Sequence, residues 1–328
     1  MNQFGNLFRI SIYGESHQSA IGVIIDGMKP GVLFDESLLL NDLQRRKAGA
    51  VGTTLRVEDD NPVITSGILN GYTTGSPIHV MFENMNKRSE DYKNLLTQPR
   101  PGHADFVAYN KYKGFNDNRG GGHFSGRLTT TIVAAGAFAK MLTNHQIESK
   151  LIQVGDLTDL NGLDSYLKEI SESFDSVGGI IEITVKNPEI GLGEPFFDSV
   201  ESKISHMLFS IPAVKGVEFG VGFKGITLKG SEFNDLIIDE KGKTITNHNG
   251  GINGGITNGN DIVLRVFIKP ASSIFLPQET FDFESKQIKT LQIKGRHDAC
   301  IARRALVVIE AACAIALADL YLEKQSRE

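Results

Sequence analysis

The apolar segment at residues 305–322, ALVVIEAACAIALADLYL, constrains the fold more than any other part of this chain. Its length approaches the roughly 20 apolar residues that a membrane-spanning helix needs. However, Glu310 and Asp319 interrupt the segment, and acidic side chains are rare inside a membrane. Its alanines allow neighbouring helices to approach closely. We therefore expect a long helix that is buried inside a globular protein.

Segments with strand and helix patterns are interleaved along the rest of the chain. The strand patterns lie at residues 8–14, 20–28, 178–187, 215–230 and 260–270, with two short strands expected around glycine turns in 61–84. Helix patterns lie at residues 35–49, where leucines recur at helical spacing, and at 129–145, which is rich in small residues. Since no linker divides the chain, we expect a single domain over residues 1–328, of the α+β class, with its helices inside.

Composition excludes several classes of protein. A hydrophobic content of 40% and a charged content of 22% over 328 residues are those of a globular protein. The net charge of −5 and the isoelectric point near 5.9 argue against a general nucleic-acid or membrane-surface binder, so local cations must hold any anionic ligand. The two cysteines, Cys300 and Cys313, offer neither a disulfide framework nor a CxxC site. Together with an N-terminus that lacks a basic leader, they favour a cytoplasmic protein.

The run HNGGINGGITNGN at residues 248–260 contains five glycines and four asparagines. Glycine loses conformational freedom on folding and asparagine favours turns, so this run cannot form an ordinary helix or a well-packed strand. Because it lies between strand-like segments, we interpret it as a working loop. Some other interaction must offset the entropy cost of ordering it.

A second glycine pattern, formed by Gly220, Gly222 and Gly225, matches the GxGxxG motif of dinucleotide-binding sites. That motif needs a helix to begin at the glycines, so that the helix N-terminus faces the pyrophosphate. We expect the following residues, ITLKG, to form a strand and a turn instead. We therefore interpret these glycines as bulges or tight packing in a sheet, and a nicotinamide oxidoreductase is only a weak alternative.

Two stretches of the sequence have both a functional and a plain structural interpretation. Arg45, Arg46 and Lys47 end the helix expected over residues 35–49, and local sequence alone favours a solvated basic turn that stabilises the helix dipole. The motif RPGHAD at residues 100–105 combines a cation, a turn, an imidazole and a carboxylate, as proton transfer requires. Its alternative is a capped helix start, in which the His and Asp side chains merely satisfy backbone donors.

Three further motifs carry chemically useful groups. RGGGHFSGRLTTT, at residues 119–131, is a glycine loop that opens into a helix and presents free amides to an anion, or else a flexible turn. KGRHDACIARRA, at residues 294–305, places Asp298 before the long apolar helix, where it is either a functional group or the N-cap. YGESH ends in His17, and Glu15 is near enough to orient it, although a lone histidine is more often structural.

Taken together, these motifs suit proton transfer on a small anionic substrate beside a phosphate-bearing cofactor. The order GESH, RPGHAD, RGGG, HNGGINGG, KPASS and RHD closely resembles the chorismate synthases, and the resemblance extends from Phe4 to about Leu322. It implies a carbon–oxygen lyase of the shikimate pathway, which eliminates phosphate and a ring proton from 5-enolpyruvylshikimate 3-phosphate to give chorismate. It also implies reduced FMN as cofactor without net redox change, a homotetramer, and a β-α-β sandwich with long apolar helices between two antiparallel sheets.

The resemblance also implies a role for individual residues. His17 would protonate the departing phosphate, His103 would set the protonation of the reduced flavin, and Asp298 would help the flavin nitrogen to take the substrate proton. Arginine forks match carboxylate and phosphate groups, and the substrate-binding residues would be Arg46, Arg100 and Arg127. The flavin-binding residues would be His123, Phe124, Ser125, Pro212, Ala213, Gly254, Lys269, Pro270, Ala271, Ser272, Ser273 and Arg296.

This chain departs from the family pattern at positions that matter for binding. An arginine expected between Val51 and Gly52 is missing, and Lys47 and His123 are the candidates to replace its charge. The other departures are Gln18 after GESH, His123, Phe124, Gly126 and Leu128 in the RGGG motif, and Ala299 in place of the proline of RHDPC.

These departures leave a second hypothesis open: a paralogue that binds flavin or a phosphorylated ligand but has reduced or lost lyase activity. Losing one charge-assisted contact typically costs about 1.5–3 kcal/mol, which weakens binding without abolishing it. We expect the flavin to be reduced by an external flavin reductase or other reductant, with NADPH as an indirect source, because the sequence contains no obvious nicotinamide site.

Overall fold

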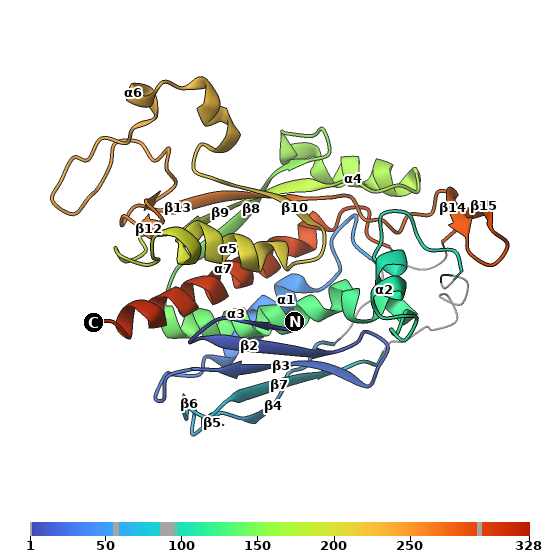
Figure 1. The fold of residues 1–328 in the computed structure, drawn as a ribbon, viewed down its shortest axis with the longest axis horizontal. Coiled ribbons are helices and arrows are strands. Elements are labelled where there is room, and N and C mark those ends of the chain that lie inside the picture. The colour runs from blue at the N-terminus through green and yellow to red at the C-terminus, as the bar shows by residue number, and fades with distance from the viewer. Residues whose placement is uncertain (1, 55–58, 86–94, 96, 294–296) are drawn as a thin grey trace.

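The protein has an α+β fold, as expected, with two larger antiparallel sheets and several helices (Figure 1). The computed structural model describes residues 2–54, 59–85, 95, 97–293 and 297–328. The first sheet has the order β1-β2-β3-β7-β4, with strands β1 (Gln3–Phe4), β2 (Arg9–Gly14), β3 (Ala20–Asp26), β7 (Ile78–Glu83) and β4 (Val63–Ser66). The second has the order β10-β13-β9-β8, with strands β10 (Val214–Phe219), β13 (Ile262–Ile268), β9 (Gly179–Val185) and β8 (Ile147–Val154).

Three hairpins, seven α-helices and several short 3-10 helices complete the regular structure among the described residues. The hairpins are β5 (Ile68–Leu69) with β6 (Tyr72–Thr73), β11 (Ile252–Asn253) with β12 (Ile256–Thr257), and β14 (Gln278–Asp282) with β15 (Gln287–Leu291). The helices are α1 (Glu36–Arg46), α2 (Asp105–Lys111), α3 (Thr129–Thr143), α4 (Leu163–Glu172), α5 (Val200–Phe209), α6 (Gly230–Phe233) and α7 (Ala302–Gln325).

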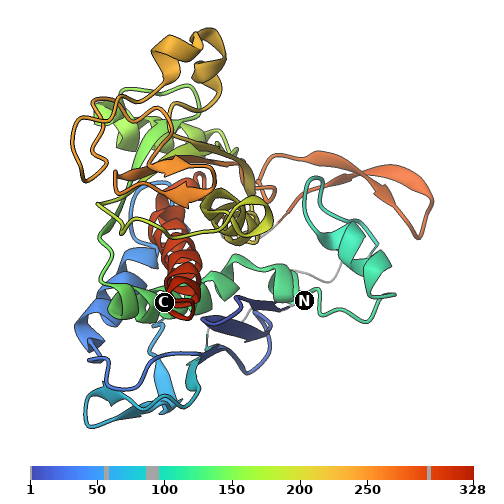
Figure 2. The same cartoon turned by 60° about the vertical axis from the view of Figure 1, so that its left-hand side comes forward.

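Helices α1, α3, α5 and α7 lie between the two larger sheets, and both views place α7 in the middle of the molecule (Figures 1 and 2). By length and composition alone, α7 passes as a membrane span, but 83% of its most apolar window is buried inside this protein. The expectation of a buried helix is therefore confirmed. Its alanines allow close packing, since a Cβ atom on Gly136 of α3 would lie 2.3 Å from the Cβ atom of Ala311.

The two acidic residues that interrupt α7 are buried and paired. Glu310 accepts hydrogen bonds from Arg45 of α1, Lys140 of α3 and Ser149 of β8. Burial alone raises the pKa of Glu310, but the bonds from Arg45 and Ser149 outweigh it and hold this pKa below its usual value. Asp319 accepts hydrogen bonds from the backbone N–H groups of residues 6–8, and so it holds the segment between β1 and β2 against α7.

Some boundaries differ from the sequence prediction. Residues 61–84 form four strands rather than two, because a bulge between Ile64 and Ser66 and a turn at Gly67 divide the segment. The strand expected at residues 215–230 ends at Phe219 and continues as a 3-10 helix, Gly222–Thr227, so the prediction of a strand at ITLKG is wrong. Gly220 is tightly packed, as predicted, but beyond the end of β10 rather than in a sheet: Val221 donates to the carbonyl of His248, and a Cβ atom on Gly220 would lie 2.0 Å from that oxygen. Gly222 and Gly225 lie in the 3-10 helix, so the prediction of a sheet position is wrong for them as well.

Candidate functional site

The GESH loop between β2 and β3 lies directly against the RGGG loop that precedes α3. The Ser16 hydroxyl donates to the carbonyls of Arg119 and Gly120 at 3.2 and 2.9 Å, and the Ser16 N–H donates to the Gly122 carbonyl at 3.2 Å. The backbone of Gly120 also contacts the ring of His17, where an added Cβ atom would lie 2.4 Å from Nε2. Gly120 has a φ of 59°, so both the left-handed conformation and the lack of space require glycine.

The RPGHAD loop approaches the same glycine-rich loop at Gly121. A Cβ atom on Gly121 would lie 3.6 Å from Cε1 and 3.7 Å from Nε2 of His103, which is ordinary van der Waals contact. The structure therefore brings His17 and His103 to two adjacent glycines of one loop, although 86 positions separate them in the sequence. His17 is buried with an exposed fraction of 4%.

Arg100, His103 and Asp105 form one hydrogen-bonded group. Arg100 donates to both carboxylate oxygens of Asp105, from Nε at 2.7 Å and from NH2 at 2.8 Å. Nδ1 of His103 lies 2.6 Å from Asp105 and 3.0 Å from the NH2 group of Arg100. Because arginine only donates, and the contact with the carboxylate is shorter, we assign Nδ1–H as the donor to Asp105. This leaves Nε2 as the nitrogen next to Gly121.

The capping interpretation of RPGHAD is wrong. The N-cap of α2 is Ala104, and no side chain caps this helix. Asp105 is instead the first residue of α2, and its carboxylate serves Arg100 and His103. Burial raises the pKa of Asp105, but hydrogen bonds from Arg100 and His103 outweigh burial and hold the pKa far below its usual value. Asp105 therefore stays charged and fixes the tautomer of His103.

The KPASS segment, which follows β13, is joined to the RPGHAD loop. Lys269 Nζ donates to the Gly102 carbonyl at 2.8 Å, and the Ser272 hydroxyl donates to the same oxygen at 2.7 Å. Arg100 donates to the Ser273 hydroxyl at 3.0 Å. The Lys269 N–H donates to the carbonyl of Ala213, a residue with a φ of 75°, so Pro212 and Ala213 lie beside KPASS. Burial, reinforced by Lys215, lowers the pKa of Lys269.

Arg46 and Arg127 lie in a buried cluster around Asp60. Arg46 NH1 donates to one carboxylate oxygen of Asp60 at 3.0 Å, and Arg127 NH1 donates to the other. The exposed fraction is 5% for each arginine. The expected solvated basic turn is therefore wrong, because Arg46 is buried and Arg45 pairs with Glu310. Burial lowers the pKa of Arg46 to about 9, with Asp60 opposing this effect and Arg304 reinforcing it, so the guanidinium remains charged at neutral pH.

Asp298 connects this cluster to the start of α7. Its Oδ1 accepts the Thr54 N–H at 2.9 Å, and both of its oxygens lie 3.3 Å from Arg304 NH1. The N-cap of α7 is Ile301, without a side-chain cap, so the N-cap interpretation of Asp298 is wrong. Arg296, predicted to contact flavin, lies outside the described residues.

The remaining predicted flavin contacts fall in two places. Ser125 caps the turn that carries Arg127, and Phe124 is partly exposed beside Tyr112. The two ring nitrogens of His123 lie 2.8 Å from the Gly14 carbonyl and 3.0 Å from the Asn2 side chain. Gly254 belongs to the β11–β12 hairpin, at the opposite end of β13 from KPASS (Figure 1). Within one chain, the structure does not bring Gly254 to the other predicted contacts that it describes.

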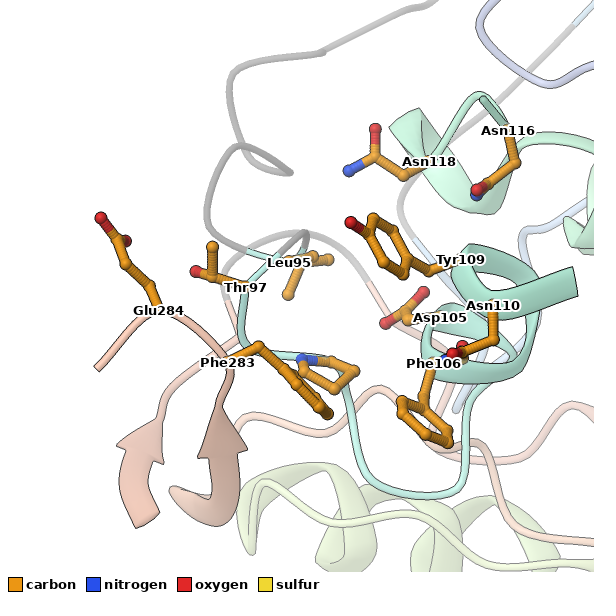
Figure 3. Close-up of a pocket in the computed structure, with 11 residues that line it drawn as sticks. Leu95, Thr97, Asp105, Phe106, Tyr109, Asn110, Asn116, Asn118, Phe283 and Glu284 are labelled. Carbon is orange, nitrogen blue, oxygen red and sulfur yellow. The ribbon is translucent and has the colours of Figure 1, made fainter. Parts of the chain in front are cut away.

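A cavity of about 340 Å³ adjoins the RPGHAD loop, with Asp105 in its wall (Figure 3). Phe106 of α2 and Phe283 of the β14–β15 hairpin stack at 5.5 Å on one side of it, and Tyr109 and Asn118 face it from another. None of the described residues that line it is an arginine or a lysine. The predicted anion-binding arginines therefore do not open into this cavity.

Sequence reasoning missed Asp60, Thr54 and Arg304. Asp60 lies in the acidic stretch EDDNP, which has no helical or strand pattern to indicate burial. In the structure, Asp60 has a positive φ of 49°, which asparagine and aspartate tolerate better than most residues. This backbone angle cannot be read from the sequence. The backbone N–H of Thr54 donates to Asp298, and Arg304 donates to the backbone carbonyl of Arg46. A motif made of side chains does not reveal either contact.

Comparisons with known proteins identify the family of this chain. The family model described as chorismate synthase matches residues 8–322. A chorismate synthase of Chitinophaga pinensis is 54% identical, over 99% of this chain and 98% of its own length, and one of Pyrococcus abyssi is 42% identical over 96% of each. A solved structure described as a crystal structure of chorismate synthase is 26% identical, with a TM-score of 0.76, and covers 98% of this chain and 93% of its own. The chain belongs to the chorismate synthase family.

Proposed function

We propose that the protein converts 5-enolpyruvylshikimate 3-phosphate into chorismate by anti 1,4-elimination of phosphate and a ring proton, with reduced FMN and no net redox change. The protein is thus a carbon–oxygen lyase of the shikimate pathway, which leads to the aromatic amino acids. The observation that supports the proposal most is that His17 contacts Gly120 while His103 lies near the adjacent Gly121. Two imidazoles at one glycine-walled loop suit a reaction in which one proton leaves the substrate and another reaches the departing group.

His17 is the acid in this proposal. Phosphate that leaves without a proton or a cation nearby carries away uncompensated charge, and a positioned general acid typically contributes about 100- to 10,000-fold in rate. Contact with Gly120 on one side limits the movement of the His17 ring, and Ser16 fastens the two loops together. Arg46, Arg100 and Arg127 are the cations proposed for the phosphate and the two carboxylates of the substrate.

The residues around KPASS fit a phosphate-bearing, planar cofactor. Lys269, Ser272 and Ser273 supply polar side chains next to the RPGHAD loop: Lys269 donates to the Gly102 carbonyl and to Ser272, and Ser273 accepts from Arg100. When bound, reduced FMN would supply a ring nitrogen that accepts the substrate proton. His103 would control protonation at the flavin through Nε2, while Asp298, held by Thr54 and Arg304, would assist the transfer.

FMN would be held by the residues named above, His123, Phe124, Ser125, Pro212, Ala213, Lys269, Pro270, Ala271, Ser272, Ser273 and Arg296. Gly254 lies apart from them in one chain, so its proposed contact would require a different protomer of the homotetramer.

The proposal also includes the single domain over residues 1–328, the β-α-β sandwich, a cytoplasmic location, and an external reductant that draws on NADPH. The helix layer between the two sheets supports the sandwich.

One observation favours the alternative of a paralogue with reduced or lost activity. His123 stands where the family has an arginine, and its two ring nitrogens are engaged by Gly14 and Asn2 rather than directed toward a ligand. Against this alternative, the described residues His17, His103 and Asp298 are all held by specific contacts.

The test is turnover under anaerobic conditions. The purified protein is mixed with chemically reduced FMN and 5-enolpyruvylshikimate 3-phosphate, and phosphate release is followed together with chorismate absorbance. We expect turnover only with reduced flavin, and a rate at least about 100-fold lower for His17→Ala. His206→Ala, an exposed histidine on α5, is the matched control and keeps the normal rate. Flavin binding without phosphate release would support the paralogue, and hydride transfer from NADPH would support an oxidoreductase.

A further inference from the structure

The buried carboxylate of Asp60 lies between two of the arginines proposed to bind substrate. Its side chain is 1% exposed, and its two oxygens are divided between Arg46 and Arg127. Each guanidinium therefore binds a different oxygen of one carboxylate. This is the arrangement that a phosphate or a carboxylate of a ligand would itself adopt between two arginines.

The Nε and NH2 nitrogens of both arginines also donate to the protein. Arg46 donates from Nε to Thr129 Oγ1 at 3.0 Å and from NH2 to the Gly126 carbonyl at 3.2 Å. Arg127 donates from Nε to Asn84 Oδ1 at 3.1 Å and from NH2 to the Glu83 carbonyl at 3.2 Å. These contacts position the two guanidiniums, and an anion that binds to the nitrogens facing Asp60 competes with its carboxylate.

The charges in this cluster do not balance. Arg46, Arg127 and Arg304 interact with the two carboxylates of Asp60 and Asp298, which leaves one positive charge uncompensated among the described residues. Removal of Asp60 would leave two. Because Arg46, Arg127 and Asp60 are shielded from water, each added charge there strengthens the attraction for an anion more than it would at an exposed site.

We propose that Asp60 is a resident counter-ion, which positions Arg46 and Arg127 and competes with substrate and product oxyanions for them. This inference depends on the proposed role of the two arginines. Competition from Asp60 limits the affinity of the site for phosphate, which the reaction must release in every turnover. Tighter binding of substrate and product alike would not speed the chemical step, so a competing carboxylate favours turnover.

The substitution Asp60→Asn separates charge from shape. Asparagine has nearly the same size and tolerates the φ of 49° found at this position. Asp59→Asn is the matched control, since it removes the same charge from the preceding residue, which is exposed. The probe is inorganic phosphate, and its binding is measured by calorimetry and by the phosphate-dependent rise in Tm, without flavin or substrate.

We expect Asp60→Asn to bind phosphate at least about tenfold more tightly than the unmodified protein, the factor that corresponds to one charge-assisted contact. Asp59→Asn should match the unmodified protein. In turnover, Asp60→Asn should be inhibited by phosphate at about tenfold lower concentration, with both kcat and KM reduced. Equal or weaker phosphate binding by Asp60→Asn would overturn the proposal, and a merely structural role for Asp60 predicts that result.

A variant that fails to fold is also informative. If Asp60→Asn is unstable because two guanidiniums face each other without a counter-ion, phosphate in the refolding buffer should restore the fold, as should the charge-retaining Asp60→Glu. Failure of saturating phosphate to do so counts against the proposal. Because phosphate binding, Tm and refolding are measured without turnover, these three results remain valid even if the lyase activity is absent, so the two hypotheses fail separately.

Discussion

Gly120 shows how one residue without a side chain organises this site. Alanine at this position would place its Cβ atom 2.4 Å from the His17 ring and 2.6 Å from Ser16 Oγ, in a backbone with a φ of 59°. We expect Gly120→Ala to displace His17 and to lower kcat by about 100-fold, because misplacement by about 1 Å has that effect. The left-handed backbone adds a loss of about 1–2 kcal/mol in the free energy of unfolding. Phosphate release and urea unfolding measure the two effects.

Gly126→Ala is the control for this prediction. Gly126 lies in the same loop, has no atom within 4 Å of the added Cβ position, and does not have a positive φ. Its backbone carbonyl, which accepts from Arg46, is unchanged by the substitution. If Gly120→Ala and Gly126→Ala had the same kcat, contact with His17 would not be what makes Gly120 necessary.

Residues such as Arg46 mark the limit of what sequence can predict about the site. Its position at the end of a helix is predictable, because leucine spacing and Asp35 as N-cap are local signals. Its burial is not, because its partners Asp60, Gly126 and Thr129 lie 14, 80 and 83 positions away. Family resemblance identifies the arginine, but only the fold reveals the carboxylate that it shares with Arg127.

At the scale of elements, the helices were predictable where their patterns are continuous. Helices α3 and α7 follow from long runs of small and apolar residues, and the strands β2, β3, β9 and β13 follow from short apolar runs. The segment at residues 61–84 was not predictable in detail, because a bulge interrupts its period of two. The 3-10 helix after Phe219 has no periodic signal at all.

Contact between α3 and α7 leads to a prediction about their packing. Alanine favours a helix over glycine by about 1 kcal/mol, so Gly136→Ala would stabilise an exposed helix. Here the new Cβ atom would lie 2.3 Å from Ala311 Cβ and 2.5 Å from its Cα, and overpacking typically costs about 1–3 kcal/mol. We expect the clash to prevail, with a net loss of about 1–2 kcal/mol in urea unfolding. Gly162→Ala, at an exposed glycine with no atom within 4 Å of the added Cβ, is the control.

At the scale of the whole molecule, the chain has an arm that is apolar but not covered by the rest of the protein. Residues 222–245, which include α6, project beyond the sheets in both views (Figures 1 and 2). Their exposed apolar side chains are Phe223, Ile226, Leu236, Ile237, Ile238 and Ile245, with exposed fractions between 53% and 90%. Exposed apolar surface of this kind typically marks a contact between protein molecules.

We expect this arm to contribute to the proposed homotetramer, since a second copy is the partner that the resemblance implies. Ile226→Asp would place a charge at a side chain that is 90% exposed in one chain, so it should leave the folded protomer stable but weaken assembly. Sedimentation should then detect smaller species at micromolar concentration. Ile288→Asp, an exposed isoleucine on the distant β15 strand, should not change the assembly. If Ile226→Asp remained a tetramer of unchanged stability, the arm would lie outside the interface, and its apolar side chains would need another partner.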